Sequence, residues 1–241
     1  MKTFKILIIA TGLCISCPAS AYQVKGLFKK AEKALTNSGL SEEEIGKGLR
    51  EALIKGISVG SDLASQLDGY FGNPSIKLPF PPDAQRVETT LRNMGFGAKV
   101  DEFILTLNRG AEKAAKESKD IFIEAIRAMT IQDALGILKG EDDAATQYLM
   151  RTTSQTLFRK FQPIIKRALD EVNATRYYAD LVNTYNKVPL VRKANPDLDE
   201  YATNKAIEGL FYLIAIEEGK IRKDPLARTS DILKKVFSQQ D

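Results

Sequence analysis

The chain has 241 residues, of which 44% are apolar and 27% are charged, proportions that are ordinary for a globular protein. Its formal net charge is only +4, and it contains no histidine and no tryptophan. The lack of histidine excludes Ser-His-Asp and Cys-His catalytic arrangements and the zinc, copper and di-iron sites that need imidazole ligands.

Residues 1–21 are typical of a secretory signal peptide. Lys2 and Lys5 precede an apolar run, Ile6 to Ile15, that is too short to span a bilayer, and Ala19-Ser20-Ala21 is a small-residue cleavage site. We expect cleavage after Ala21. The alternative is lipid anchoring through Cys17, although the residues before it match a lipobox poorly.

Cleavage would remove both cysteines, Cys14 and Cys17, together with two lysines. The remaining chain would be nearly neutral, which does not favour nucleic acid as a partner. It would also lack disulfides and thiol chemistry. Carboxylate acid–base chemistry, a Ser–Lys pair and an oxygen-ligated Ca²⁺ or Mg²⁺ remain chemically possible, but no motif indicates a metal or a cofactor, and none is expected.

Residues 22–38 form an amphipathic pattern with basic residues on the polar side. We interpret it as an N-terminal helix docked on its own domain; the alternative is peripheral contact with an anionic membrane surface. Ser41 and Glu44 then make a capping box, which predicts a helix that continues to Leu67. Its repeated glycines, such as Gly56 and Gly60, predict close approach to a neighbouring helix.

Residues 70–82 (YFGNPSIKLPFPP) are too rich in proline for a regular helix and too apolar for a free linker. We predict a rigid strap across the helices, with a strand-like piece at Ser75–Leu78; the alternative is the lid of a pocket. A short helix is expected from Asp83 to Asn93.

Residues 100–129 form the predicted centre of the fold, because apolar residues recur there at helical spacing on more than one side. A polar strip of Asp101, Asn108 and Glu112 runs between the apolar faces. These side chains either hydrogen-bond neighbouring helices or contribute to a binding site.

The rest of the chain predicts further helices. One is capped by Thr130 and Asp133, and the next is capped by Asp142 or Asp143 and is kinked or restarted at Pro163. Others are expected over 174–185, 197–221 and 227–237, followed by a tail at 238–241. The apolar stretch 210–216 indicates a buried helix, and Glu218, four residues before Arg222, shares an inward face. The prediction is a single all-α domain of about nine helices over residues 40–237.

Several motifs resemble one bacterial family, domain-of-unknown-function family 4197: LSEEEIGKGLREAL, FGNPSIKLPFP, VDEFILTLNRGAEKAA, IFIEAIRAMTIQDALGILKGEDDAATQYL, FQPIIKRAL and KAIEGLFYLIAIEEGKIRKDPLARTSDILKKVF. They extend from about Leu40 to Phe237. The resemblance implies an exported helical domain of bacteria, which together with the leader indicates the periplasm of a Gram-negative cell. It implies no assigned activity.

Two functional hypotheses follow, besides a purely structural role in the envelope. The first is a periplasmic module whose helices enclose an apolar groove that binds a small amphiphilic ligand or a partner peptide. Its candidate ligand-binding residues are Asn108, Arg109, Glu112, Arg151, Thr152 and Glu218. The second is a hydrolase with Glu112 or Glu218 as general base. The first is favoured, and no catalytic residue is assigned, because the sequence offers no activating partner for a nucleophile.

Overall fold

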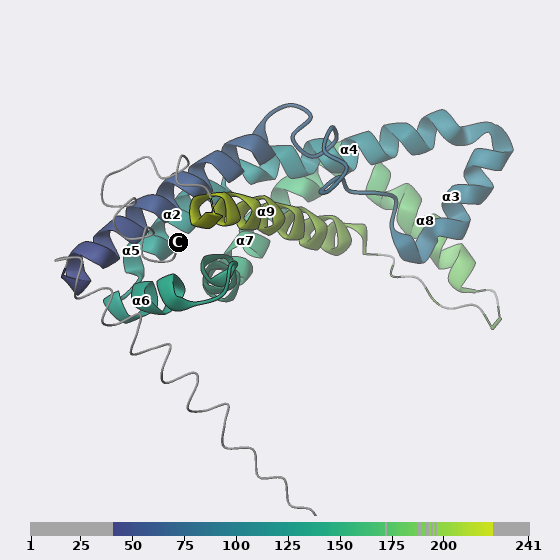
Figure 1. Ribbon diagram of the computed structural model, residues 1–241. Coiled ribbons are helices and arrows are strands. Elements are labelled where there is room, and N and C mark those ends of the chain that lie inside the picture. Colours follow the sequence, from purple (N-terminus) through teal and green to yellow (C-terminus); the bar gives the residue numbers. More distant parts are fainter. Residues whose placement is uncertain are drawn as a thin grey trace, which may run out of the picture. The chain divides into compact units, whose positions relative to one another are not determined.

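The computed structural model describes residues 41–171, 173–187, 189–190, 193, 195 and 197–223. They all belong to the second of two units, Met1–Leu40 and Ser41–Asp241, into which the chain divides. The described residues contain helices, turns and loops but no strand, which confirms the predicted all-α fold (Figure 1). The expected leader, N-terminal helix, 227–237 helix and tail lie outside the described residues.

Helix α2 (Glu42–Ser65) begins at the predicted capping box. The hydroxyl of Ser41 accepts a hydrogen bond from the backbone N–H of Glu44, and the Glu44 carboxylate accepts one from the N–H of Ser41. Two glycines bring α2 close to α9 (Leu198–Lys223), because a Cβ atom at Gly56 would lie 3.0 Å from Ile221 and one at Gly60 would lie 3.5 Å from Ile214. The predicted close approach is confirmed.

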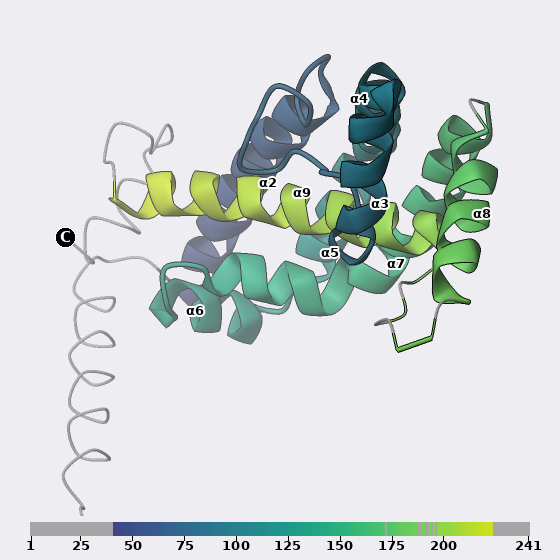
Figure 2. The same cartoon turned by 90° about the vertical axis from the view of Figure 1, so that its right-hand side faces the viewer.

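Helices α4 (Gly97–Ala115) and α5 (Ser118–Ala128) form the predicted centre and are separated by a break at Lys116 and Glu117. The apolar stripe of α4 is buried at Leu107, Ala111 and Ala114. It packs against α2, α7 (Ala144–Glu171) and α9, and α9 itself packs between α2 and α7 (Figures 1 and 2).

The predicted cap at Thr130 and Asp133 starts α6 (Ile131–Lys139). Helix α7 runs through Pro163 as one element rather than restarting there, and buried Phe161 and Ile165 secure it on both sides of the proline. The sequence indicated that α9 is buried on all sides at residues 210–216, but one side is exposed. Its Tyr212 side is open to solvent, because the neighbouring helices cover only the other sides.

The strap is confirmed as an ordered, non-helical segment that packs on the helices. Tyr70, Leu78 and Phe80 are buried, and the Tyr70 hydroxyl donates to the backbone carbonyl of Ala206 in α9 at 2.6 Å. The prediction of a strand-like piece at Ser75–Leu78 is wrong. The N–H groups of Ile76 and Lys77 both donate to the carbonyl of Asn73 and close turns instead.

Between the strap and α4 the chain forms a short 3₁₀ turn, η1 (Pro82–Ala84), then α3 (Gln85–Leu91) and a π-helical turn, η2 (Arg92–Phe96). Gly95 turns the chain with φ of 90°. Helix α8 (Ala174–Asn186) joins α7 to the segment before α9. Helices α3 and α8 lie at one end of the described helices, and α6 lies at the other (Figures 1 and 2).

Candidate functional site

The candidate residues Asn108, Arg109 and Glu112 on α4 hold the strap in place. The fully buried Asn108 amide accepts a hydrogen bond from the N–H of Leu78 at 2.8 Å and donates to the carbonyl of the same residue at 2.9 Å. It therefore pairs with the strap backbone as a neighbouring strand would.

The Glu112 carboxylate accepts hydrogen bonds from the N–H groups of Tyr70 and Phe71 at 3.2 and 3.1 Å. Its other oxygen accepts from Arg109 at 2.6 Å, and Arg109 also reaches Asp68 at 2.7 Å. Burial, with a smaller contribution from the Glu112 charge, raises the pKa of the Tyr70 hydroxyl. These contacts satisfy backbone groups that the strap cannot pair internally.

Glu218 makes a second junction, at the N-terminus of α7. Its carboxylate accepts from the N–H groups of Ala145 and Thr146 and from the Thr146 hydroxyl at 2.8–2.9 Å, and Arg222 donates to it from within α9. The predicted inward orientation and pairing with Arg222 are therefore present. This distant carboxylate takes the place of the expected local caps: the Asp142 carboxylate pairs with Lys223, and the Asp143 carboxylate accepts from the side chain of Gln147.

Arg151 and Thr152 lie on the exposed side of α7. The Arg151 guanidinium lies over the ring of Tyr148 at 5.6 Å, and the Thr152 hydroxyl donates to the carbonyl of Tyr148. The six candidate residues thus make their contacts in three places: on the strap, at the start of α7 and on the α7 surface. A ligand-binding role for any of them stays a prediction.

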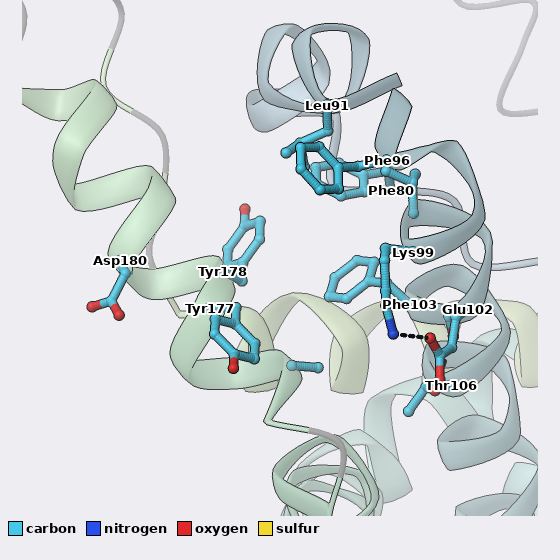
Figure 3. A pocket seen from close by; sticks show the side chains of 12 residues that line it. Phe80, Leu91, Phe96, Lys99, Glu102, Phe103, Thr106, Tyr177, Tyr178 and Asp180 are labelled. Carbon is cyan, nitrogen blue, oxygen red and sulfur yellow. Dashed lines mark hydrogen bonds and ion pairs between the residues drawn. The ribbon is translucent and has the colours of Figure 1, made fainter. Parts of the chain in front are cut away.

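A cleft of about 670 Å³ lies elsewhere, between α8 on one side and α3, η2 and α4 on the other (Figure 3). Its volume is in the range of small-molecule binding sites. Eight of its twelve lining residues are apolar or aromatic. They are Phe80, Leu91, Phe96, Val100, Phe103, Ala174, Tyr177 and Tyr178.

Three rings form the inner wall of this cleft. Phe80, at the end of the strap, lies 5.1 Å from Phe103 of α4 and 6.1 Å from Tyr178 of α8, measured between ring centroids. Phe103 and Tyr178 stack nearly parallel at 6.2 Å. The Tyr178 hydroxyl donates to the carbonyl of Asn195, and burial raises its pKa to about 12, so the wall is uncharged at ordinary pH.

Polar groups lie at the rim of the cleft. The Lys99 ammonium pairs with Glu102 at 3.1 Å, while Thr106 donates to the backbone carbonyl of Glu102. Asp180 points away from the rings (Figure 3). Tyr177 of α8 and Phe96 of η2 line the cleft from opposite sides, and both rings are partly exposed. The arrangement has an apolar floor and a mixed rim, which suits a molecule with an apolar body and a polar end.

Only parts of this cleft can be anticipated from the sequence. Phe103 belongs to the predicted apolar stripe of residues 100–129. Phe80 belongs to the strap, for which the lid of a pocket is the alternative interpretation. Tyr177 and Tyr178 stood out only as a tyrosine-rich stretch. Nothing local in the sequence indicated that α8 and α4 meet.

Two further searches of the described residues bear on chemistry. No cluster of three or more Asp, Glu, His or Cys residues among them is arranged to hold a metal ion. Among the same residues, no helix has the length and apolar character needed to cross a bilayer.

The sequence pattern of one family, described as "Protein of unknown function (DUF4197)", matches residues 39–238. The chain belongs to this family, as its motifs suggested. No curated protein and no solved structure matches the chain.

Proposed function

For this member of the family we propose a binding role, in which the cleft between α8 and the α3–α4 segment binds a small amphiphilic molecule. The observation that carries the proposal is the inner wall of Phe80, Phe103 and Tyr178 beneath a rim of paired charges. Such a wall favours the apolar part of a ligand through burial of its surface, while the rim keeps its polar end in water.

The expected site of action is outside the cytoplasm, in the periplasm. Support for this part of the proposal comes from the leader pattern of residues 1–21, together with the resemblance to an exported bacterial family. A carrier or sensor of amphiphiles would act there by shielding the apolar part of its ligand from the aqueous compartment.

Hydrolysis is the less supported alternative. Glu112 and Glu218, the two carboxylates that a hydrolase would use, accept hydrogen bonds from backbone N–H groups and from arginines. Neither lines the cleft. We therefore assign no catalytic residue. The structural alternative differs from the proposal in requiring no ligand at all.

A fluorescence titration with the apolar probe N-phenyl-1-naphthylamine tests the binding role. Phe96→Ser and Tyr177→Ser each remove a partly exposed ring from the opening, so little folding stability should be lost. We expect each change to weaken probe binding at least about fivefold, the loss that follows from removing one apolar contact of about 1 kcal/mol.

Tyr212→Ser is the matched control, because Tyr212 is a similarly exposed ring on α9 that does not line the cleft. Its affinity for the probe should equal that of the unchanged protein. If the unchanged protein and the three variants bind the probe equally, or if none of them binds it, the cleft is not the binding site.

A further inference from the structure

Residues Met94, Gly95 and Phe96 form an apolar corner between α3 and α4. Met94 is 66% exposed and Phe96 is 49% exposed, although both are large apolar side chains. Gly95 has the positive φ that suits glycine, and a Cβ atom added to it would meet no atom within 4 Å. The corner projects from the described helices into open space (Figure 1).

Helix α3 packs mainly against its chain neighbours η1, η2 and α4. The corner is therefore held out by a helical hairpin rather than folded onto the core. A stable contact with another protein normally buries about 800 Å² on each partner, far more than two side chains on a convex tip provide. Two apolar side chains on a projecting tip are better suited to insertion among lipid headgroups.

The charges beside the corner are balanced. Arg92 pairs with Glu88 and with Asp101, both at 2.9 Å, and Lys99 pairs with Glu102. The corner thus presents no excess of positive charge to anionic lipids. Its attraction to a bilayer would come from apolar burial, and should depend little on ionic strength.

The corner is continuous with the cleft. Phe96 belongs to both, Leu91 lines the cleft from the last turn of α3, and Tyr177 stands at the opposite rim with 65% of its surface exposed. A bilayer that received Met94 and Phe96 would lie at the opening of the cleft. Tyrosine is a side chain favoured at such membrane interfaces.

We propose that the Met94–Phe96 corner inserts into the surface of a phospholipid membrane and that the cleft exchanges its amphiphilic ligand with that membrane. The exchange rests on the proposed function, whereas the insertion does not. The partner is the lipid bilayer itself.

A single labelled cysteine at position 94 tests the insertion. The described residues contain no cysteine, so Met94→Cys can carry an environment-sensitive nitrobenzoxadiazole label. The protein is purified as the cell processes it, and intact mass must show one label per chain. On addition of vesicles of phosphatidylethanolamine and phosphatidylglycerol in equal parts, the emission should shift to the blue and strengthen, and brominated lipids should quench it.

Leu67→Cys is the matched control, because Leu67 is 74% exposed but lies before the strap, away from the corner. Its label should not respond. An equal response at both positions, or none at position 94, would overturn the insertion. So would a response at position 94 that disappears in high salt, since adsorption would then be electrostatic.

Met94→Glu separates insertion from ligand binding. Met94 does not line the cleft, so the variant should bind N-phenyl-1-naphthylamine in solution as the unchanged protein does. The rate at which the variant takes up the probe from preloaded vesicles should fall about tenfold or more, whereas Leu67→Glu should leave this rate unchanged. An unchanged uptake rate in Met94→Glu would overturn the proposed exchange with the membrane. If neither the unchanged protein nor its variants bind the probe in solution, the proposed function is refuted instead.

Discussion

Buried polar side chains in this domain bind the backbone of segments far away in the chain. The sequence predicts that Asn108 and Glu112 share a polar strip and that Glu218 faces inward, and all three side chains are buried. Their partners, Leu78, Tyr70 and Thr146, could not be predicted, because these pairings depend on where the strap and the start of α7 lie in three dimensions.

Replacing Glu218 by glutamine should destabilise the fold by about 2–4 kcal/mol. The amide would place a donor against the donors of Ala145, Thr146 and Arg222 and would remove the carboxylate charge to which the buried guanidinium is hydrogen-bonded. Urea unfolding followed by circular dichroism measures the loss.

Glu208→Gln is the control for this substitution, since Glu208 forms an exposed ion pair with Lys205 on the same helix. It should change stability by less than about 0.5 kcal/mol. Equal effects of the two substitutions would mean that Glu218 does not stabilise the junction of α7 and α9.

Tyr178 should make stability depend on pH in the alkaline range. Its folded-state pKa is raised to about 12 by burial, first, and by the charge of Asp83. An unfolded tyrosine ionises near about pH 10, so the neutral form stabilises the fold below that pH and the advantage is lost between about pH 10 and 12.

Tyr178→Phe removes this ionisable group from the wall of the cleft. The difference in unfolding free energy between the two proteins should be constant up to about pH 9. It should then move by about 1–3 kcal/mol in favour of the variant as the pH approaches 12. A difference that stays constant to pH 12 would show that the hydroxyl is freely solvated in the folded state.

At the scale of elements, the sequence was informative wherever local chemistry decides the structure. Both capping boxes, Ser41–Glu44 and Thr130–Asp133, start helices as predicted. Prediction failed where a distant segment decides. The strap turns at Asn73 instead of extending, and α7 takes its cap from Glu218 instead of from Asp142 or Asp143.

Two glycines of α9 should respond in opposite ways to alanine. A Cβ atom at Gly209 would lie 2.9 Å from the Tyr70 ring and 3.0 Å from Ile76, so Gly209→Ala should push the strap away and cost about 1–3 kcal/mol. At Gly219 a Cβ atom would meet nothing within 4 Å, so alanine should stabilise by about 0.5–1 kcal/mol through helix propensity.

Thermal unfolding of both variants checks this pair, with limited proteolysis of residues 66–80 as a second readout. Faster cleavage of that segment is expected only in Gly209→Ala. Stabilisation by both substitutions would indicate that the strap does not pack closely on α9.

At the scale of the whole molecule, the cleft is a product of tertiary packing. Its wall takes Phe80 from the end of the strap, Phe103 from α4 and Tyr178 from α8. Periodicity in the sequence predicted α4 and α8 as separate helices but carries no information on which of them meet. For that reason the sequence directed attention to the polar strip of α4, while the cleft lies at another part of the same helix.

The most direct measurement of the binding role is photolabelling with a fatty acid that carries a diazirine in its chain, followed by peptide mapping. Label should concentrate in the cleft segments, residues 96–106 and 174–178, and excess N-phenyl-1-naphthylamine should suppress it. Label spread over other exposed apolar side chains, such as Leu63 and Tyr212, or unaffected by the competitor, would contradict a binding site in the cleft.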